Sequence, residues 1–241
     1  MTSHWRRLDY SEQIRVNTGA VREEARLLVQ RMADPTYQAQ QWEQRYDPQI
    51  EDVNRLCDTL AESKPGSAVP YIDPIHDVDG CKIVSLFSNP GPSLPSGFVS
   101  FENDDPSSVR MAGIYEAVGL RPDAFMPWNA HPWYLPEGKE RALTLDQISD
   151  GVKPLLTFLQ QVPRASALIA HGADAHKAAR RLMKLENRAI VRRGFKIYEV
   201  RSPGERAFKG TPANQEQWLL DIQSAYTDAM GRAGIRSRQV I

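Results

Sequence analysis

Four short apolar segments, each followed by a polar or glycine-containing loop, constrain the fold of this chain more than any other feature. They cover residues 82–87, 124–129, 165–170 and 196–200. Apolar residues at helical spacing follow or separate them, over residues 107–118, 144–161, 173–185 and 214–230. Strands that alternate with helices in this way form a parallel sheet with helices on both faces. The sequence therefore predicts an α/β fold with a parallel-type central sheet flanked by helices.

The first 65 residues follow a different pattern. Residues 11–62 are polar and favour helix, and the Asp-Pro pairs at 34–35 and 47–48 divide them into two or three helices. Residues 64–67, Lys-Pro-Gly-Ser, form the clearest linker in the chain. We therefore predict an N-terminal helical extension over residues 1–65 and an α/β domain over residues 66–241.

The net formal charge of zero conceals a gradient along the chain. Residues 1–65 carry 9 basic and 11 acidic side chains, residues 66–163 carry 6 and 12, and residues 164–241 carry 15 and 7. Bulk charge therefore does not indicate a polybasic protein. The excess of basic residues in the last third predicts a local surface for an anion such as a phosphate backbone.

The two cysteines, Cys57 and Cys81, are too few for a disulfide framework, and neither has a Cys or His at metal-ligand spacing. We expect buried or idle thiols, no metal and no redox cofactor. No uninterrupted apolar run approaches the roughly 18 residues that a membrane span needs. The expectation is a cytoplasmic monomer without a membrane partner.

The loop after the first apolar segment combines rigid and permissive residues. Pro90 restricts the backbone, and Gly91 suits a close approach to a ligand. Asn89 would then point its amide into a site, although an ordinary Asx-turn explains an Asn-Pro-Gly sequence equally simply. Downstream, Phe98 and Phe101 lie in a segment too polar for a core strand. Either ring could stack on a planar base, and both could equally pack inward.

The loops after the next two segments add aromatic, amide and imidazole groups. Residues 127–134 contain Trp128, Asn129 and His131 in a stretch with two further aromatics, as a planar hydrogen-bonding ligand would require. A rigid loop that closes a core edge is the alternative interpretation. His171 follows the third segment, where a structural histidine is the simpler explanation.

The last loop combines cations, a hydroxyl group and glycine. Its candidate residues are Arg201, Ser202, Gly204, Arg206 and Lys209. This composition fits phosphate contact by side chains and backbone N–H groups. A charged surface turn would look the same.

In this order, the loops resemble the uracil-DNA glycosylase superfamily over about residues 68–230. The matching motifs are Pro-Gly-Pro at 90–92, Gly-Phe-Val-Ser to Asn-Asp-Asp over 97–105, Trp-Asn to Pro-Trp-Tyr over 128–134, and His-Gly at 171–172. The Asn-Pro-Gly-Pro form is similar to that of the single-strand-selective monofunctional enzymes. The resemblance implies a three-layer α/β/α fold, and the residues before 66 lie outside it.

The resemblance also implies roles for individual residues. Asn89 would position water at the sugar C1′, because an amide is too weak a base to deprotonate it. Gly91 stands where the classical uracil enzymes carry a Tyr that blocks the C5 edge of the base, so C5 substituents should be tolerated. Asn129 would hydrogen-bond the pairing edge of a flipped pyrimidine, either uracil or cytosine. Phe101, or alternatively Phe98, takes the place of the stacking aromatic.

One motif departs from the family pattern. Relatives carry His-Pro-Ser in the last loop, where the His stabilises negative charge on the departing base, whereas this chain has Arg201-Ser202-Pro203. Arg201 could supply that charge, His131 or His171 could act from another loop, or the activity is weakened or redirected.

The sequence thus predicts a monofunctional DNA glycosylase that excises a C5-modified pyrimidine. A candidate base is the glucosylated 5-hydroxymethylcytosine of phage DNA, in an anti-phage role. One alternative is a uracil-DNA glycosylase of base-excision repair. Another is a catalytically inactive DNA-binding module of the same fold, because the expected His is missing.

Overall fold

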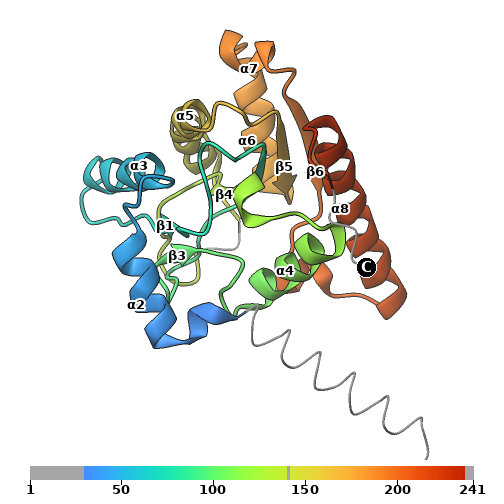
Figure 1. The fold of residues 1–241 in the computed structure, drawn as a ribbon, viewed down its shortest axis with the longest axis horizontal. Coiled ribbons are helices and arrows are strands. Elements are labelled where there is room, and N and C mark those ends of the chain that lie inside the picture. Colours follow the sequence, from blue (N-terminus) through green and yellow to red (C-terminus); the bar gives the residue numbers. More distant parts are fainter. Residues whose placement is uncertain (1–29, 140–141, 237–241) are drawn as a thin grey trace, which may run out of the picture.

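The computed structural model describes residues 30–139 and 142–236, and within them the four predicted strands form one parallel sheet. The strands are β2 (Ile83–Phe87), β4 (Phe125–Asn129), β5 (Ala167–His171) and β6 (Lys196–Val200). Their order across the sheet is β4-β2-β5-β6. Figure 1 shows helices on both sides of this sheet, so the three-layer α/β/α prediction is confirmed.

The two faces of the sheet are covered by different helices because side chains alternate along each strand. Val84 and Leu86 point into a core shared with α3 (Glu51–Glu62), α5 (Leu145–Gln161), α6 (Ala173–Lys184) and α7 (Arg188–Arg192). Ile83 points to the opposite face, against α4 (Pro106–Val118) and α8 (Pro212–Arg232). The predicted strands and helices of the α/β region agree with these bounds to within two residues.

Local capping signals explain where several helices begin and end. Asp105 caps the start of α4 by accepting hydrogen bonds from two backbone N–H groups, and Gly119 ends it in the left-handed conformation. Thr144 and Gln147 form a reciprocal capping box at the start of α5. The short 3-10 turns η2 (Pro122–Ala124) and η3 (Glu205–Phe208) lead into β4 and α8 respectively.

The prediction that residues 97–105 are too polar to include a core strand was wrong. β3 (Phe98–Val99) pairs in parallel with β1 (Tyr71–Ile72), and Phe98 is fully buried. The polar neighbours support this strand, because the Ser96 hydroxyl and the Asn103 amide both donate hydrogen bonds to the Phe98 carbonyl. Polarity in this segment therefore comes from groups that pair with the strand's own backbone.

The helices before residue 65 pack against the sheet domain. The described part begins with η1 (Arg31–Ala33), α2 (Pro35–Gln44) and α3, and the predicted helices before residue 30 lie outside it. Ile50, Val53 and Cys57 share one core with α5, and Cys81 is also buried. The boundary predicted near residue 65 falls in the turn that follows α3. No helix in the described ranges has the length and apolar character needed to cross a bilayer.

The topology brings several loops to one edge of the sheet. The chain passes from β2 to β4 on one side and then to β5 on the other, so the order reverses between β2 and β5. Ligands of open parallel sheets bind at such a reversal, beyond the carboxyl ends of the strands. The loops after β2, β4 and β5 all lie at this edge.

Gly151 of α5 allows the helix to approach the loop after β4. A Cβ at this position would lie 1.6 Å from the Ala130 carbonyl oxygen, so Gly151→Ala should destabilise the protein by about 3 kcal/mol through overpacking. The matched control is Gly113→Ala in α4, where an added Cβ meets nothing within 4 Å and should stabilise by about 0.5–1 kcal/mol. Urea denaturation of both variants measures the difference, and equal midpoints would contradict it.

Candidate functional site

Four side chains form a row across the carboxyl edge of the sheet. Phe87 is the register partner of Asn129, and His171 is the register partner of Val200. The rings of Phe87 and His171 stack with centroids 4.8 Å apart, which joins the two pairs. Strand alternation places this row on the face covered by α4 and α8. We refer to Asn129, Phe87, His171 and Val200 as the edge row.

The loops after β2 and β4 stay hydrogen-bonded beyond the ends of the strands. The N–H groups of Ala130 and His131 donate to the carbonyls of Phe87 and Ser88, at 2.7 and 3.0 Å. Further along, the N–H of Leu135 donates to the Gly91 carbonyl at 2.9 Å. Asn89 and Asn129 therefore lie on two adjacent, paired segments at the same edge.

The Asn129 side chain is the amide at this edge without a hydrogen-bond partner in the described residues. Its side chain is buried, with 4% of the residue exposed, and forms no hydrogen bond with any residue of the described ranges. An amide offers two donors and an acceptor oxygen, and these groups of Asn129 form no bond within the described part of the protein. The arrangement indicates a place where a ligand with complementary donors and acceptors binds.

Asn89 is held by its own loop. Its Oδ1 accepts a hydrogen bond from the Gly91 N–H at 2.9 Å, which is the Asx-turn considered from the sequence, and its Nδ2 donates to the Ser88 Oγ at 3.0 Å. Because an amide oxygen can accept two hydrogen bonds, the turn is compatible with a water on the same oxygen. Pro90 is buried. Gly91 has φ of +78°, and an added Cβ there would meet no atom within 4 Å.

Two residues that the sequence analysis missed lie behind Asn89. The Ser88 hydroxyl donates to Asp174 Oδ2 at 3.3 Å, and the Leu143 N–H donates to the same oxygen at 2.9 Å. Lys177 pairs with the other carboxylate oxygen at 3.2 Å. Asp174 lies in the first turn of α6, directly after the His171-Gly172 loop. A carboxylate two residues beyond a candidate loop was the available sequence signal.

His171 belongs to a buried chain of hydrogen bonds beneath the edge row. The Tyr115 hydroxyl donates to Ser85 Oγ at 3.1 Å, Ser85 and the Tyr226 hydroxyl are 2.7 Å apart, and Tyr226 is 2.8 Å from His171 Nε2. If each hydroxyl donates its hydrogen bond toward His171, Nε2 is the acceptor and Nδ1 carries the ring proton. Burial lowers the pKa of His171 to about 3, and the Arg201 backbone offsets only part of this effect.

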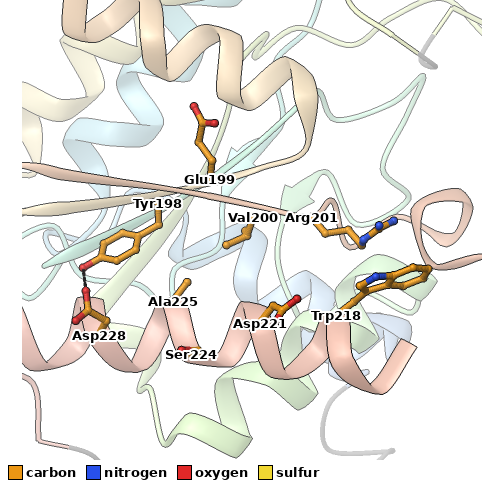
Figure 2. Close-up of a pocket in the computed structure, with 9 residues that line it drawn as sticks. All are labelled: Tyr198, Glu199, Val200, Arg201, Trp218, Asp221, Ser224, Ala225 and Asp228. Carbon is orange, nitrogen blue, oxygen red and sulfur yellow. Dashed lines mark hydrogen bonds between the residues drawn. The ribbon is translucent and has the colours of Figure 1, made fainter. Parts of the chain in front are cut away.

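His131 and Arg201, the other two candidates for charge stabilisation, are bound elsewhere. His131 Nδ1 is 3.1 Å from the Gln147 carbonyl at the start of α5, and burial lowers its pKa. The Arg201 guanidinium lies 3.7 Å from the centre of the Trp218 ring and donates to the Ala207 carbonyl at 2.7 Å. Figure 2 shows Arg201 beside Trp218 of α8, at the edge of the sheet formed by β6.

The groove in Figure 2 is separate from the two asparagines. It has a volume of about 540 Å³ and lies between β6 and α8. Several of its charges are neutralised within the protein: Asp228 by Lys196 and the Tyr198 hydroxyl, and Glu199 by Arg180. Asn89 and Asn129 do not line this groove. Val200 is the one member of the edge row that lines the groove, so the candidate site lies at the two asparagines and not in the groove.

The aromatic candidates pack against other aromatic side chains of the protein. Phe98 lies against Trp42 and Tyr71, and Trp128 stacks on Phe158 in the core with centroids 4.3 Å apart. Phe101 is half-buried beside Tyr115 and Phe125, which begins β4, whereas Asn129 ends that strand. The ring at the carboxyl edge is Phe87, which sequence analysis placed in the strand itself. Its position as the last residue of β2 was the signal.

The loop after β6 packs against the loop after β5. A Cβ on Gly172 would lie 2.8 Å from the Ser202 Cβ, and the Ser202 hydroxyl accepts a hydrogen bond from the Gly204 N–H at 3.3 Å. Arg206 and Lys209 are exposed beyond this turn. Ser202, one of the phosphate-binding candidates, therefore lies next to the His171-Gly172 loop, on the side away from Asn129.

The basic residues of the last third do not form one surface at this edge. α6 runs back from the carboxyl edge, and α7 precedes β6, so α7 lies at the opposite edge (Figure 1). Arg188 and Arg192 lie on α7, while Arg180 pairs with Glu199. Fewer positive charges therefore lie beside the edge row than the charge gradient along the sequence predicts.

Within the described residues, no three His, Cys, Asp or Glu side chains are grouped as ligands for a metal ion. No model of a known protein family matches the chain, and no curated protein matches it. The arrangement of residues at the edge of the sheet is therefore the basis for a functional proposal.

His171 should remain neutral across the physiological pH range. Its ordinary pKa of about 6.5 applies to the unfolded chain, and burial lowers it to about 3 in the fold. The unfolded state therefore takes up a proton first, so this residue's contribution to stability is complete above pH 6.5 and is lost as the pH falls toward 3. NMR of the imidazole nitrogens from pH 8 to 5 should show no titration in the folded protein. A midpoint near 6.5 that persists in the folded state would contradict the burial argument.

Proposed function

We propose that this protein is a DNA glycosylase that flips a pyrimidine nucleotide out of the strand and hydrolyses its N-glycosidic bond. The observation that carries the proposal is the unpaired, buried Asn129 amide on a segment paired to the one that holds Asn89. Enzymes that act on a base extrude it into a pocket and hydrogen-bond its pairing edge. The ordered resemblance of the four loops to the uracil-DNA glycosylase superfamily supports the same function.

The chemistry assigned to the two amides is complementary. Asn129 donates to and accepts from the pairing edge of the flipped base, in either amide orientation. Asn89 orients a water toward C1′ without deprotonating it, so the glycosidic bond breaks largely before water adds. The bond electrons leave with the base, which takes up a proton, and the water oxygen forms the new bond to C1′. The product is an abasic site.

The open space at Gly91 supports a substrate with a substituent at C5. No heavy atom of the described residues lies within 4 Å of a Cβ built at this position, so these residues leave the space beside Gly91 open. A C5-modified pyrimidine, such as glucosylated 5-hydroxymethylcytosine in phage DNA, is the proposed base, and an anti-phage role follows from that substrate. Uracil is the alternative base for the same pocket.

Three residues were considered for stabilising negative charge on the departing base, and His171 is the best placed of them. It is the one that belongs to the edge row with Asn129, whereas Arg201 stacks on Trp218 and His131 binds the start of α5. A neutral imidazole can stabilise a developing anion by donating a hydrogen bond.

The position of Arg201 also favours a second candidate function. With its guanidinium held by Trp218 and the Ala207 carbonyl, Arg201 does not take the place of the family histidine at the edge row. A DNA-binding module of the same fold without turnover fits this observation. It predicts DNA binding without release of any base.

Incubation with glucosylated phage DNA, uracil-containing DNA and unmodified DNA tests the function directly, with abasic sites as the measurement. We expect cleavage of the C5-modified DNA. Asn89→Ala should lower turnover at least 100-fold with DNA affinity nearly unchanged, because positioned groups of this kind contribute about 10²–10⁴-fold. Asn129→Ala should abolish base selection while general DNA binding persists. Equal cleavage of unmodified DNA, or wild-type turnover by either variant, would overturn the proposal.

Gly91→Tyr should shift selectivity away from C5 substituents. The matched control is Gly91→Ala, because both variants carry the same strain at φ of +78° and differ in side-chain bulk. We expect the ratio of kcat/KM for the C5-modified base to that for uracil to be at least tenfold lower in the tyrosine variant. An equal ratio in the two variants would show that Gly91 does not face C5.

A further inference from the structure

We propose that Asp174, acting through the Ser88 hydroxyl, is a positioning residue that fixes which way the Asn89 amide points. The role of the amide itself rests on the proposed function. The inference concerns a contact between α6 and the loop after β2, two parts of the chain that are 86 residues apart.

The contacts form one continuous chain from a carboxylate to the candidate water-positioning group. Asp174 Oδ2 accepts from Ser88 Oγ at 3.3 Å, and Ser88 Oγ accepts from Asn89 Nδ2 at 3.0 Å. At the far end of the amide, Asn89 Oδ1 accepts from the Gly91 N–H at 2.9 Å. Each of the three hydrogen bonds connects residues from the candidate site or directly behind it.

The direction of these hydrogen bonds follows from the chemistry of the groups. An ionised carboxylate can only accept, so the single hydroxyl proton of Ser88 is committed to Asp174. The Ser88 oxygen is then left as an acceptor, and it favours the NH₂ side of the Asn89 amide over the oxygen side. The Gly91 N–H, a donor, favours the amide oxygen at the other end. Both ends therefore select the same one of the two amide orientations.

The surroundings of Asp174 hold its carboxylate in position. It is the second residue of α6, and only 8% of it is exposed. The N-terminal end of a helix favours a negative charge, and Lys177 pairs with Oδ1, the oxygen that does not contact Ser88. The Leu143 N–H adds a second donor to Oδ2. The carboxylate therefore anchors the Ser88 hydroxyl from a fixed position.

Asp174→Asn tests the inference with little change in size. An amide at position 174 can donate as well as accept, so the Ser88 proton is no longer committed and the Asn89 amide can turn over. We expect kcat on the cleaved DNA to fall at least tenfold with KM and DNA affinity within twofold of wild type. Ser88→Ala, which removes the intermediate hydroxyl, should give the same split between kcat and KM.

Two control variants separate positioning from a general effect of charge. Asp146→Asn makes the same substitution in the first turn of α5, where the residue is exposed, and should leave kcat within twofold. Asp52→Asn makes the same substitution in the first turn of α3, where the residue is also exposed, and it too should leave kcat within twofold. A kcat unchanged by both Asp174→Asn and Ser88→Ala overturns the inference, as does an equal loss in the Asp146→Asn control.

A measurement without turnover distinguishes failure of this inference from failure of the proposed function. The two side-chain NH₂ proton signals of Asn89 should be distinct and slow to exchange in the wild-type protein, and should move and exchange faster in Asp174→Asn. Those changes in a protein that cleaves no DNA would support the positioning contact while rejecting the glycosylase proposal. Unchanged Asn89 signals in Asp174→Asn would overturn the positioning contact whatever the activity.

Discussion

The parallel pairing of β2 with β4, continued past the ends of both strands, is the constraint on which the site depends. Hydrogen bonds from Ala130 and His131 to Phe87 and Ser88 extend the ladder into loops that would otherwise diverge. Because parallel strands end at the same edge, this pairing brings the loops that contain Asn89 and Asn129 together. Gly151 lets α5 pack against the second loop and so limits its freedom.

The two asparagines at this edge differ in how many of their side-chain groups form hydrogen bonds within the protein, and that difference suggests different roles. Asn89 is fixed at both ends of its amide by Ser88 and Gly91, whereas Asn129 is buried without a partner among the described residues. A group that must hold one orientation through a reaction benefits from bonds within the protein. A group that recognises a ligand must leave its donors and acceptors available.

The sequence predicted the elements of the sheet domain well and the individual site residues unevenly. Periodicity located β2, β4, β5 and β6 because apolar runs and caps are local signals. It missed β3, whose backbone is supported by Ser96 and Asn103, and it offered Trp128 and Phe98 as ligand contacts although both pack inward. The direction of an aromatic side chain depends on the elements packed around it, and a loop sequence alone does not contain that information.

The sequence by itself determined the alternation of strands and helices and the residues of the loops that follow each strand. Only the tertiary structure shows that Arg201 packs on Trp218 and that His171 stacks on Phe87 in the edge row. It also shows that Asp174 is connected to Asn89 by hydrogen bonds through Ser88. The physical reason is the separation along the chain between the residues that interact. Backbone periodicity is set by neighbours three or four residues away, whereas hydrogen-bond partners and ring contacts are chosen among residues that only the folded chain brings together.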